Sequence, residues 1–207
     1  MKKNKILIII SVVLVCWLFY YYIYDGTINV RSNLDGQYYK VQNKPDSQLR
    51  ADILANLRMK LGTLVDSLKK STYYTNSSGE FYIPVRRLVS NWEAGVSIKE
   101  VGNWESDAAY VINKKHMSFC LQKSRTLNLP EMNLITYVAI HELSHVMSID
   151  TDHGGEFIKN FDFLLNFAKG IKYYDPLLKG EYPLFINLKE LDTSNSYCGV
   201  SIENSIT

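Results

Sequence analysis

One pentapeptide, His141-Glu142-Leu143-Ser144-His145, constrains this chain more than any other feature. Residues four apart lie on the same face of an α-helix, so both imidazoles can reach a single metal ion. Glu142 is offset to one side, where its carboxylate could accept a proton from a water molecule on that ion. The spacing therefore predicts zinc at His141 and His145, with Glu142 as the general base.

The sequence around the pentapeptide predicts that this helix is buried. Apolar residues occupy 138–140 before it and 146–147 after it, with no charge or proline in either flank. Burial would penalise three ionisable side chains that had no partner, and a metal ion supplies one. The alternative is a pair of core histidines satisfied by ordinary packing. We expect the helix to begin at Pro130, with Glu131 in its first turn, and to end near Ser148.

A catalytic zinc site needs a third protein ligand and an open position for water. We expect His153 in this role, because Gly154 and Gly155 predict a tight turn that would bring the chain back toward the metal. Glu156 is the alternative ligand, in the first turn of a helix predicted over 155–169. If Glu156 binds the metal, His153 would only cap that helix.

Residues 6–24 form a nearly unbroken apolar run, preceded by Lys2, Lys3 and Lys5. Its length suits one crossing of a bilayer core about 30 Å thick. The positive-inside rule then places the N-terminus in the cytosol and the following domain on the opposite side. A cleaved signal peptide is the alternative, although bulky tyrosines stand where cleavage needs small residues. The sequence thus predicts that 1–25 is a cytosolic stub followed by a single transmembrane anchor.

Charge and cysteine content limit the function further. The chain has 23 Lys+Arg against 21 Asp+Glu, and it shows no basic stripe of the kind that binds nucleic acid. No nucleic-acid partner is therefore expected, and the pairs Arg86-Arg87 and Lys114-Lys115 are predicted to be solvated surface. Cys120 and Cys198 could form a disulfide in an oxidising compartment or remain free thiols in a reducing one.

The remaining pattern predicts one α+β domain over 47–207, preceded by a polar linker or extended lead-in over 26–46. A core helix should begin at Asp46 or Ser47, a more extended region at Tyr82, and an irregular tail near residue 170. The core helix is predicted from apolar residues at helical spacing, namely Leu49, Ile53, Leu57, Leu61, Leu64, Val65 and Leu68.

A β-hairpin is predicted over 109–122, just before the metal helix. Tyr110-Val111-Ile112 and the apolar segment 117–121 flank a polar turn at Asn113-Lys114-Lys115. An edge strand within Ala109–Met117 could accept an extended substrate by adding backbone hydrogen bonds. The alternative is a core hairpin with no role in substrate binding.

The metal motif and its downstream segment resemble the zincin-like metallopeptidases of the SprT and WLM groups. The resemblance lies in His141–His145 followed by His153, Gly154 and Phe157, and it implies zinc at the three histidines with Glu142 as base. It also implies a minimal zincin-like fold, a small mixed sheet with an active-site helix. Similarity to small metallopeptidase-like proteins of large DNA viruses is carried by the stretches 109–114, 137–145 and 197–200, within roughly 105–200.

The resemblance does not extend to the substrate of the DNA-repair members. The predicted anchor and the lack of basic segments separate this chain from SprT-like proteins that act on DNA–protein crosslinks. A viral origin would make a virion membrane or an infected-cell membrane the setting, with assembly partners there.

Together these features predict a membrane-anchored zinc metallopeptidase acting on a peptide or protein substrate. Glu142 would take a proton from water and pass it to the leaving amine. Tyr174, Tyr182 and Tyr197 are candidate donors to the oxyanion. One alternative is a structural membrane or virion protein that keeps the fold without activity. Another is a zymogen whose tail covers the cleft.

Overall fold

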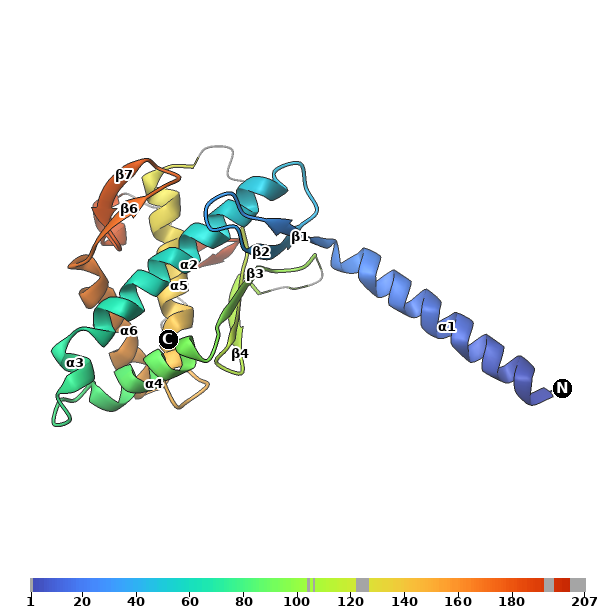
Figure 1. The fold of residues 1–207 in the computed structure, drawn as a ribbon, viewed down its shortest axis with the longest axis horizontal. Helices are drawn as coiled ribbons and strands as arrows, with labels where there is room; N and C mark the ends of the chain where they lie inside the picture. Colours follow the sequence, from blue (N-terminus) through green and yellow to red (C-terminus); the bar gives the residue numbers. More distant parts are fainter. Residues whose placement is uncertain (1, 104, 106, 122–126, 192–195, 202–207) are drawn as a thin grey trace.

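The computed structural model describes the chain except residues 1, 104, 106, 122–126, 192–195 and 202–207; it gives no side-chain description for 2–6, 19, 21–25 and 201. Its helices and strands confirm the α+β class (Figure 1). A three-stranded sheet packs against long helices, and smaller hairpins lie on either side of this core.

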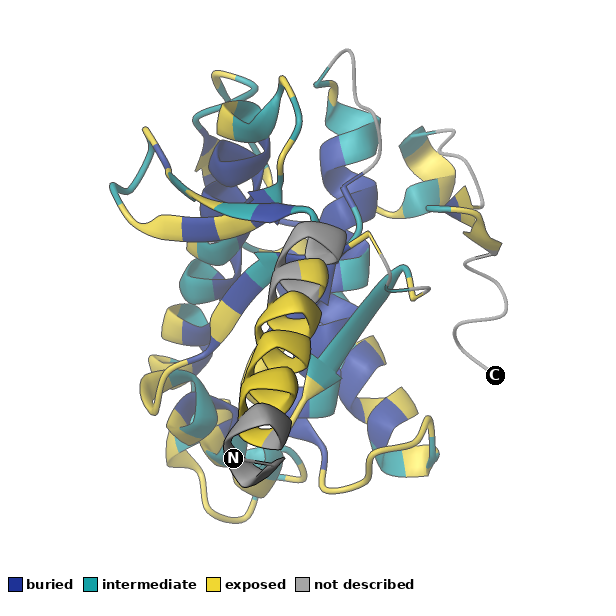
Figure 2. Cartoon of the chain, turned by 90° about the vertical axis from the view of Figure 1, so that its right-hand side faces the viewer, coloured by how far each residue is buried: buried dark blue, intermediate teal, exposed yellow. Residues whose placement is uncertain are grey.

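The first helix, α1 (Lys2–Asp25), projects away from the rest of the molecule, and its described side chains are exposed (Figures 1 and 2). No helix in the described part of the chain is long and apolar enough to cross a membrane. The predicted anchor over 1–25 is therefore wrong, as is the single-pass localisation with a cytosolic N-terminus that depended on it.

An antiparallel hairpin of β1 (Thr27–Arg31) and β2 (Tyr38–Gln42) occupies the segment predicted as a linker or extended lead-in. Tyr39 and Val41 alternate along β2 and point into the core, where they are 3% and 0% exposed. The polar residues that indicated a linker include Gly36, which takes a positive φ of 71° in the turn. The hairpin is thus the first packed element of the domain.

The core is built around α2 (Ser47–Lys69), which follows Asp46 as predicted. Its leucines at the expected spacing face inward. The fully buried ones are Leu54, Leu57, Leu61, Leu64 and Leu68.

Two further helices follow, α3 (Thr72–Thr75) and α4 (Tyr82–Glu93). The prediction of extended structure from Tyr82 is wrong. Pro84 lies in the first turn of α4, where a missing N–H costs no helical hydrogen bond. Buried apolar residues recur at Val85, Leu88 and Val89 and fix the helix on the core.

The sheet consists of β3 (Ser97–Glu100), β4 (Ala109–Ile112) and β5 (His116–Phe119) in the order β3-β5-β4. β3 runs parallel to β5, and β4 runs antiparallel to it, so the sheet is mixed. The predicted hairpin is confirmed as β4 and β5. Asn113 and Lys114 at its turn both have positive φ, 52° and 57°, as in the tight turns that match strand twist.

The two helices predicted around the metal motif are confirmed as α5 (Leu129–Met147) and α6 (Gly155–Lys169). The Asn128 side chain caps α5 by accepting a hydrogen bond from the Glu131 N–H at 2.9 Å. α5 is buried on nearly all sides, as the flanking apolar residues predicted.

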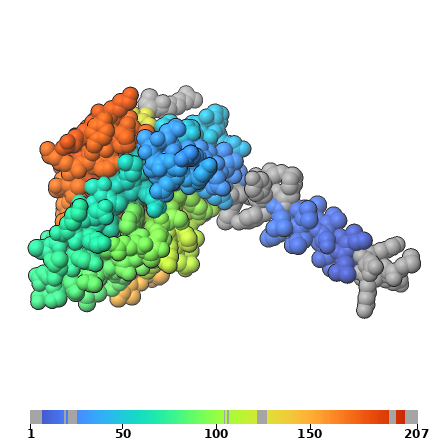
Figure 3. All heavy atoms as spheres, viewed as in Figure 1, coloured from blue at the N-terminus to red at the C-terminus, as the bar shows by residue number. Residues whose placement is uncertain are grey.

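The C-terminal part is more ordered than the predicted irregular tail. Asp175 in its first hairpin is buried and accepts a hydrogen bond from Asn56 at 3.0 Å. It also pairs with Lys60 of α2 at 2.9 Å. This hairpin lies on the side of the molecule away from α1 (Figures 1 and 3). The elements are β6 (Lys172–Asp175), β7 (Gly180–Pro183), the 3-10 helix η1 (Leu188–Leu191), β8 (Ser196–Tyr197) and β9 (Val200–Ser201).

Candidate metal centre

Helix α5 presents His141 and His145 side by side, with ring centroids 5.2 Å apart. The two residues are four apart and so lie on one helical face. His141 is buried, with 7% of its surface exposed, and His145 is partly buried.

His153 reaches the same place from the loop between α5 and α6. Its Nε2 atom lies 3.0 Å from Nε2 of His141, and ligand atoms of the three histidines all lie within 4.8 Å of one another. Two nitrogens on one tetrahedral zinc, each at about 2.0–2.1 Å, would be about 3.3 Å apart. The three histidines could therefore hold a metal ion with little movement.

The donor atoms of this cluster fit a metal better than they fit each other. His141 Nδ1 is buried and has no hydrogen-bond partner in the described part of the molecule. The only partner of its Nε2 is another imidazole nitrogen, so in either tautomer one nitrogen of His141 is left unsatisfied. A metal ion would accept the lone pairs of both facing Nε2 atoms, and each ring would then carry its proton on Nδ1.

The charge state of the histidines also suits metal binding. Burial, with the neighbouring His145 and His153, lowers the pKa of His141 to about 3. Burial, with His153 and then Lys114, lowers the pKa of His145 to about 4. Both rings are neutral at pH 7, and the neutral imidazole is the form that binds metals. The rings of Phe157 and His145, 4.3 Å apart, show the apolar packing that causes the burial.

Glu142 lies beside the cluster and is 4% exposed. Its carboxylate makes no hydrogen bond to any residue the structure describes. Burial, and then the charge of Asp107, raises the pKa of Glu142 to about 8. The carboxyl group therefore exchanges its proton near neutral pH, as a general base and acid requires.

Glu156, the alternative third ligand, is held away from the histidines. Its Oε1 accepts a hydrogen bond from Arg87 at 3.0 Å, and its Oε2 accepts one from the Ile149 N–H at 2.9 Å. Burial alone would raise the pKa of Glu156, but these hydrogen bonds hold it below its usual value. The arrangement favours His153 over Glu156 as the third ligand.

A cavity of about 630 Å³ opens in front of the histidines. β4 forms one wall of it and is the edge strand of the sheet, so its outer backbone groups are unpaired within that sheet. The lining residues are Ala109, Tyr110, Val111, Asn113, Lys114, His141, Glu142, His145, Thr151 and His153.

None of the three predicted oxyanion donors lines this cavity. Tyr174 is exposed on β6, and the Tyr197 hydroxyl donates to the Cys120 carbonyl. Tyr110 on β4 is the tyrosine that the structure brings to the cavity wall. The sequence does not single out Tyr110, because the chain has 15 tyrosines and the spacing of this one does not mark it as a donor.

Sequence reasoning also missed the cations at the end of α5. Arg87 donates to the Met147 carbonyl at 2.6 Å, and Lys114 donates to three carbonyls between residues 145 and 150. The prediction that these two residues belong to solvated surface pairs is wrong. No signal in the sequence distinguished them, because a basic pair in a turn or helix is usually solvated.

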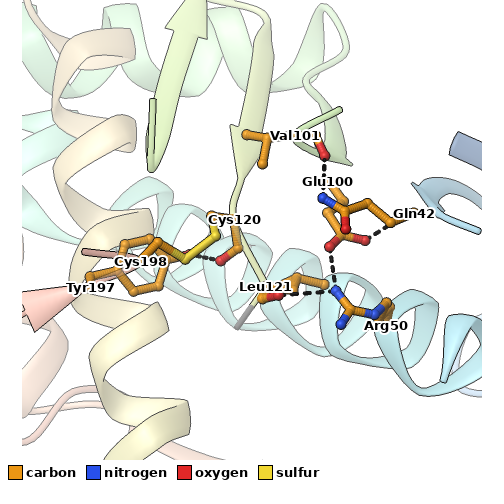
Figure 4. Close-up of a disulfide and its surroundings, with 8 residues drawn as sticks. All are labelled: Gln42, Arg50, Glu100, Val101, Cys120, Leu121, Tyr197 and Cys198. Carbon is orange, nitrogen blue, oxygen red and sulfur yellow. Dashed lines mark hydrogen bonds and ion pairs between the residues drawn. A yellow bond between two sulfur atoms is a disulfide. The ribbon is translucent and has the colours of Figure 1, made fainter. Parts of the chain in front are cut away.

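Cys120 and Cys198 form a disulfide (Figure 4). It ties the β8–β9 hairpin to the end of β5, and Tyr197 beside it is 4% exposed. The oxidised alternative left open by the sequence is the one the structure shows. No described residue of this C-terminal hairpin lines the cavity.

Three proteins of large DNA viruses are similar to this chain. The uncharacterized protein R325 of Acanthamoeba polyphaga mimivirus is 28% identical over 86% of this chain and 83% of its own length. The uncharacterized protein 042R of Invertebrate iridescent virus 3 is 30% identical over 60% of this chain and 71% of its own. The uncharacterized protein 136R of Invertebrate iridescent virus 6 is 30% identical over 41% of this chain and 50% of its own.

No family model matches the chain, and no solved structure is significantly similar to it. The predicted likeness to viral proteins is confirmed by the three relatives, whereas no comparison names a metallopeptidase. The chain belongs to the family of large-DNA-virus proteins that includes protein 042R of Invertebrate iridescent virus 3.

Proposed function

We propose that this protein is a zinc-dependent metallopeptidase that hydrolyses peptide bonds in an extended segment of a protein substrate. The observation that carries the proposal is the convergence of His141, His145 and His153 at a cavity that also holds the buried carboxylate of Glu142. The resemblance of the motif to zincin-like SprT and WLM enzymes points in the same direction.

Zinc suits this set of donors. Three imidazole nitrogens satisfy its preference for nitrogen ligands, and three protein ligands are typical of catalytic sites, which keep a fourth position open. The cavity in front of the histidines would leave that position accessible. When bound, zinc supplies Lewis acidity, which polarises a carbonyl group and makes water a stronger acid.

The chain's own residues have separate roles in this proposal. Glu142 would take a proton from the attacking water and deliver it to the leaving amine. Burial raises its pKa to about 8 in the metal-free site, and the positive charge of a bound zinc ion would lower that pKa and favour the carboxylate that acts as base. β4 would hold an extended substrate by pairing with its backbone, because its outer edge is unpaired in the sheet and borders the cavity. Phe157 and Phe161, whose rings pack against the ring of His141, would keep water away from that side of the histidine.

The test is a zinc measurement followed by a peptidase assay on the full chain. Elemental mass spectrometry should find about one zinc per chain in wild type and Glu156→Ala, and much less in His153→Ala. Hydrolysis of an unfolded protein by wild type should exceed that by Glu142→Gln by roughly 10²–10⁴-fold, the usual contribution of general acid–base catalysis. Glu142→Gln should keep its zinc.

Two outcomes would contradict the proposal. Folded wild type that takes up no zinc, even when incubated with the metal, would exclude the metal site. Zinc-loaded wild type that is no more active than Glu142→Gln on any unfolded substrate would favour the alternative, a structural protein that keeps the site without catalysis.

A further inference from the structure

Lys114 stands at the tip of the β4–β5 hairpin, in a backbone conformation that lysine seldom adopts. Its φ is 57°, directly after Asn113 at 52°. Positive φ is uncommon for a residue with a long side chain, and here it belongs to the tight turn that joins β4 to β5. The contacts of the Lys114 side chain show what this turn does beyond reversing the chain.

The ammonium group of Lys114 makes three hydrogen bonds, all to backbone carbonyls at the end of α5. Nζ lies 2.8 Å from the oxygen of His145, 2.7 Å from that of Ser148 and 2.9 Å from that of Asp150. A lysine ammonium has three protons to donate. All three are in use, so Lys114 has none left for a substrate, although its side chain borders the cavity.

The carbonyls of His145 and Ser148 lie at the end of α5. Backbone oxygens there lack helical partners, and the helix dipole is negative. Lys114 supplies both hydrogen bonds and positive charge there. Two residues of α4 complete the cap: Arg87 donates to the Met147 carbonyl at 2.6 Å, and Asn91 donates to the Val146 carbonyl at 3.1 Å. Every carbonyl from 145 to 148 thus has a side-chain donor.

Lys114 differs from these two because its contacts continue beyond the helix. The Asp150 carbonyl lies in the loop that carries His153, three residues further on. Lys114 therefore joins the backbone of one histidine of the cluster, His145, to the loop of another, across the part of the chain that must fold back toward the helix.

We propose that Lys114 is a positioning residue that fixes His153 at the distance from His141 and His145 needed to bind the metal. This inference rests on the metal site of the proposed function and adds to it the residue that assembles the site. Because Lys114 also stands in the turn that directly follows β4, it links the strand proposed to hold the substrate to the third metal ligand.

The main test compares zinc affinity in Lys114→Met and Lys115→Met, measured by competition with a chromophoric chelator. Methionine keeps much of the length of lysine but cannot donate. Residues that support metal ligands typically alter affinity by about 10–100-fold, and we expect Lys114→Met to weaken binding by that factor. Lys115 is the matched control, since it is the neighbouring exposed lysine of the same turn, and its variant should bind as wild type does.

A double variant tests whether Lys114 acts through His153. If it does, Lys114→Met should change zinc affinity little in a His153→Ala background, because the ligand it positions is already absent. An equal loss in both backgrounds would overturn the proposal. Lys114→Arg provides a second single variant, since its planar fork cannot reproduce three convergent bonds. It should bind zinc more weakly than wild type, and unchanged affinity would also count against the proposal.

Hydrogen exchange on the metal-free protein separates this inference from the proposed function. Amides of the loop from 149 to 153 should exchange faster in Lys114→Met than in wild type or Lys115→Met, whether or not zinc binds. Unchanged exchange would overturn the positioning role even if the wild type binds zinc. Absence of zinc in wild type, by contrast, would exclude the metal site itself and with it the assignment of Lys114 to metal binding.

Discussion

Two regions of this protein bury ionisable side chains. In the core these side chains form ion pairs, whereas at the cavity they do not. In the core, Arg50 is 1% exposed, pairs with Glu100, and donates to the Leu121 carbonyl at 3.0 Å (Figure 4). Lys60 is similarly paired with the buried Asp175. At the cavity, by contrast, Nδ1 of His141 is buried without a hydrogen-bond partner among the described residues, and Glu142, 4% exposed, forms no ion pair with any of them.

The contrast separates charges that support the fold from groups that need an additional ligand. A buried ion pair whose members satisfy each other requires nothing further, whereas an unpartnered buried polar atom lowers stability by about 1–3 kcal/mol. Perturbed groups of the second kind gather at functional sites because chemistry there needs them unsatisfied. The cavity residues therefore identify the candidate site more reliably than burial alone would.

The largest expected effect comes from breaking the core pair. Arg50→Met would leave Glu100 buried without its cation, and such a change typically lowers the free energy of unfolding by roughly 3–5 kcal/mol. Urea unfolding at pH 7 measures it. Arg31→Met, an exposed arginine on β1, is the control and should stay within about 0.5 kcal/mol of wild type. Equal stability of the two variants would show that the buried Arg50–Glu100 pair supports the fold no more than an exposed arginine does.

Adding the missing ligand should produce the next largest effect. Free zinc at about 100 times its dissociation constant should stabilise the wild type by about 2.7 kcal/mol. Thermal unfolding with zinc or with a chelator measures this gain. His153→Ala should gain far less, while Arg50→Met, if it folds, should gain as much as wild type. If zinc does not change the thermal unfolding of wild type, the three histidines are not a metal site.

The smallest expected effect concerns pH in the metal-free protein. Because the pKa of Glu142 is raised to about 8, the folded state keeps a proton that the unfolded state releases near pH 4.5. Stability therefore falls as pH rises to about 8 and is constant above it. From pH 7 to pH 9, wild type should lose roughly 1 kcal/mol more than Glu142→Gln, since about one pKa unit of the shift lies in this range. Parallel pH profiles of the two proteins would show that Glu142 is not perturbed.

The elements that the sequence predicted well are those specified by local signals. α5 and α6 follow from apolar repeats bounded by Pro130 and by the Gly154-Gly155 turn, and the β4–β5 hairpin follows from two apolar runs around a polar turn. The convergence of His141 and His145 needs only helical spacing. α4 was missed because Tyr82 and Ile83 favour strands and Pro84 usually ends helices, although the buried repeat began just afterwards.

The remaining features depend on contacts between distant parts of the chain. Whether Cys120 and Cys198 pair depends on their distance, 6.3 Å between Cα atoms, which sequence spacing does not give. The preference for His153 over Glu156 depends on Arg87, 69 residues earlier, which engages the glutamate. The polar composition of 27–42 predicts a linker or an extended lead-in. The hairpin there is buried through its contacts with α2, which the composition of the segment does not indicate.

The disulfide has a consequence for how the protein would respond to proteolysis. Cys120 and Cys198 are 78 residues apart, and α5, α6 and every histidine of the cluster lie between them. A single backbone nick anywhere inside that covalent ring would leave both fragments attached. If a protease cuts a loop within this ring, the nicked molecules would keep their full mass on non-reducing electrophoresis and separate into fragments only when a thiol is added.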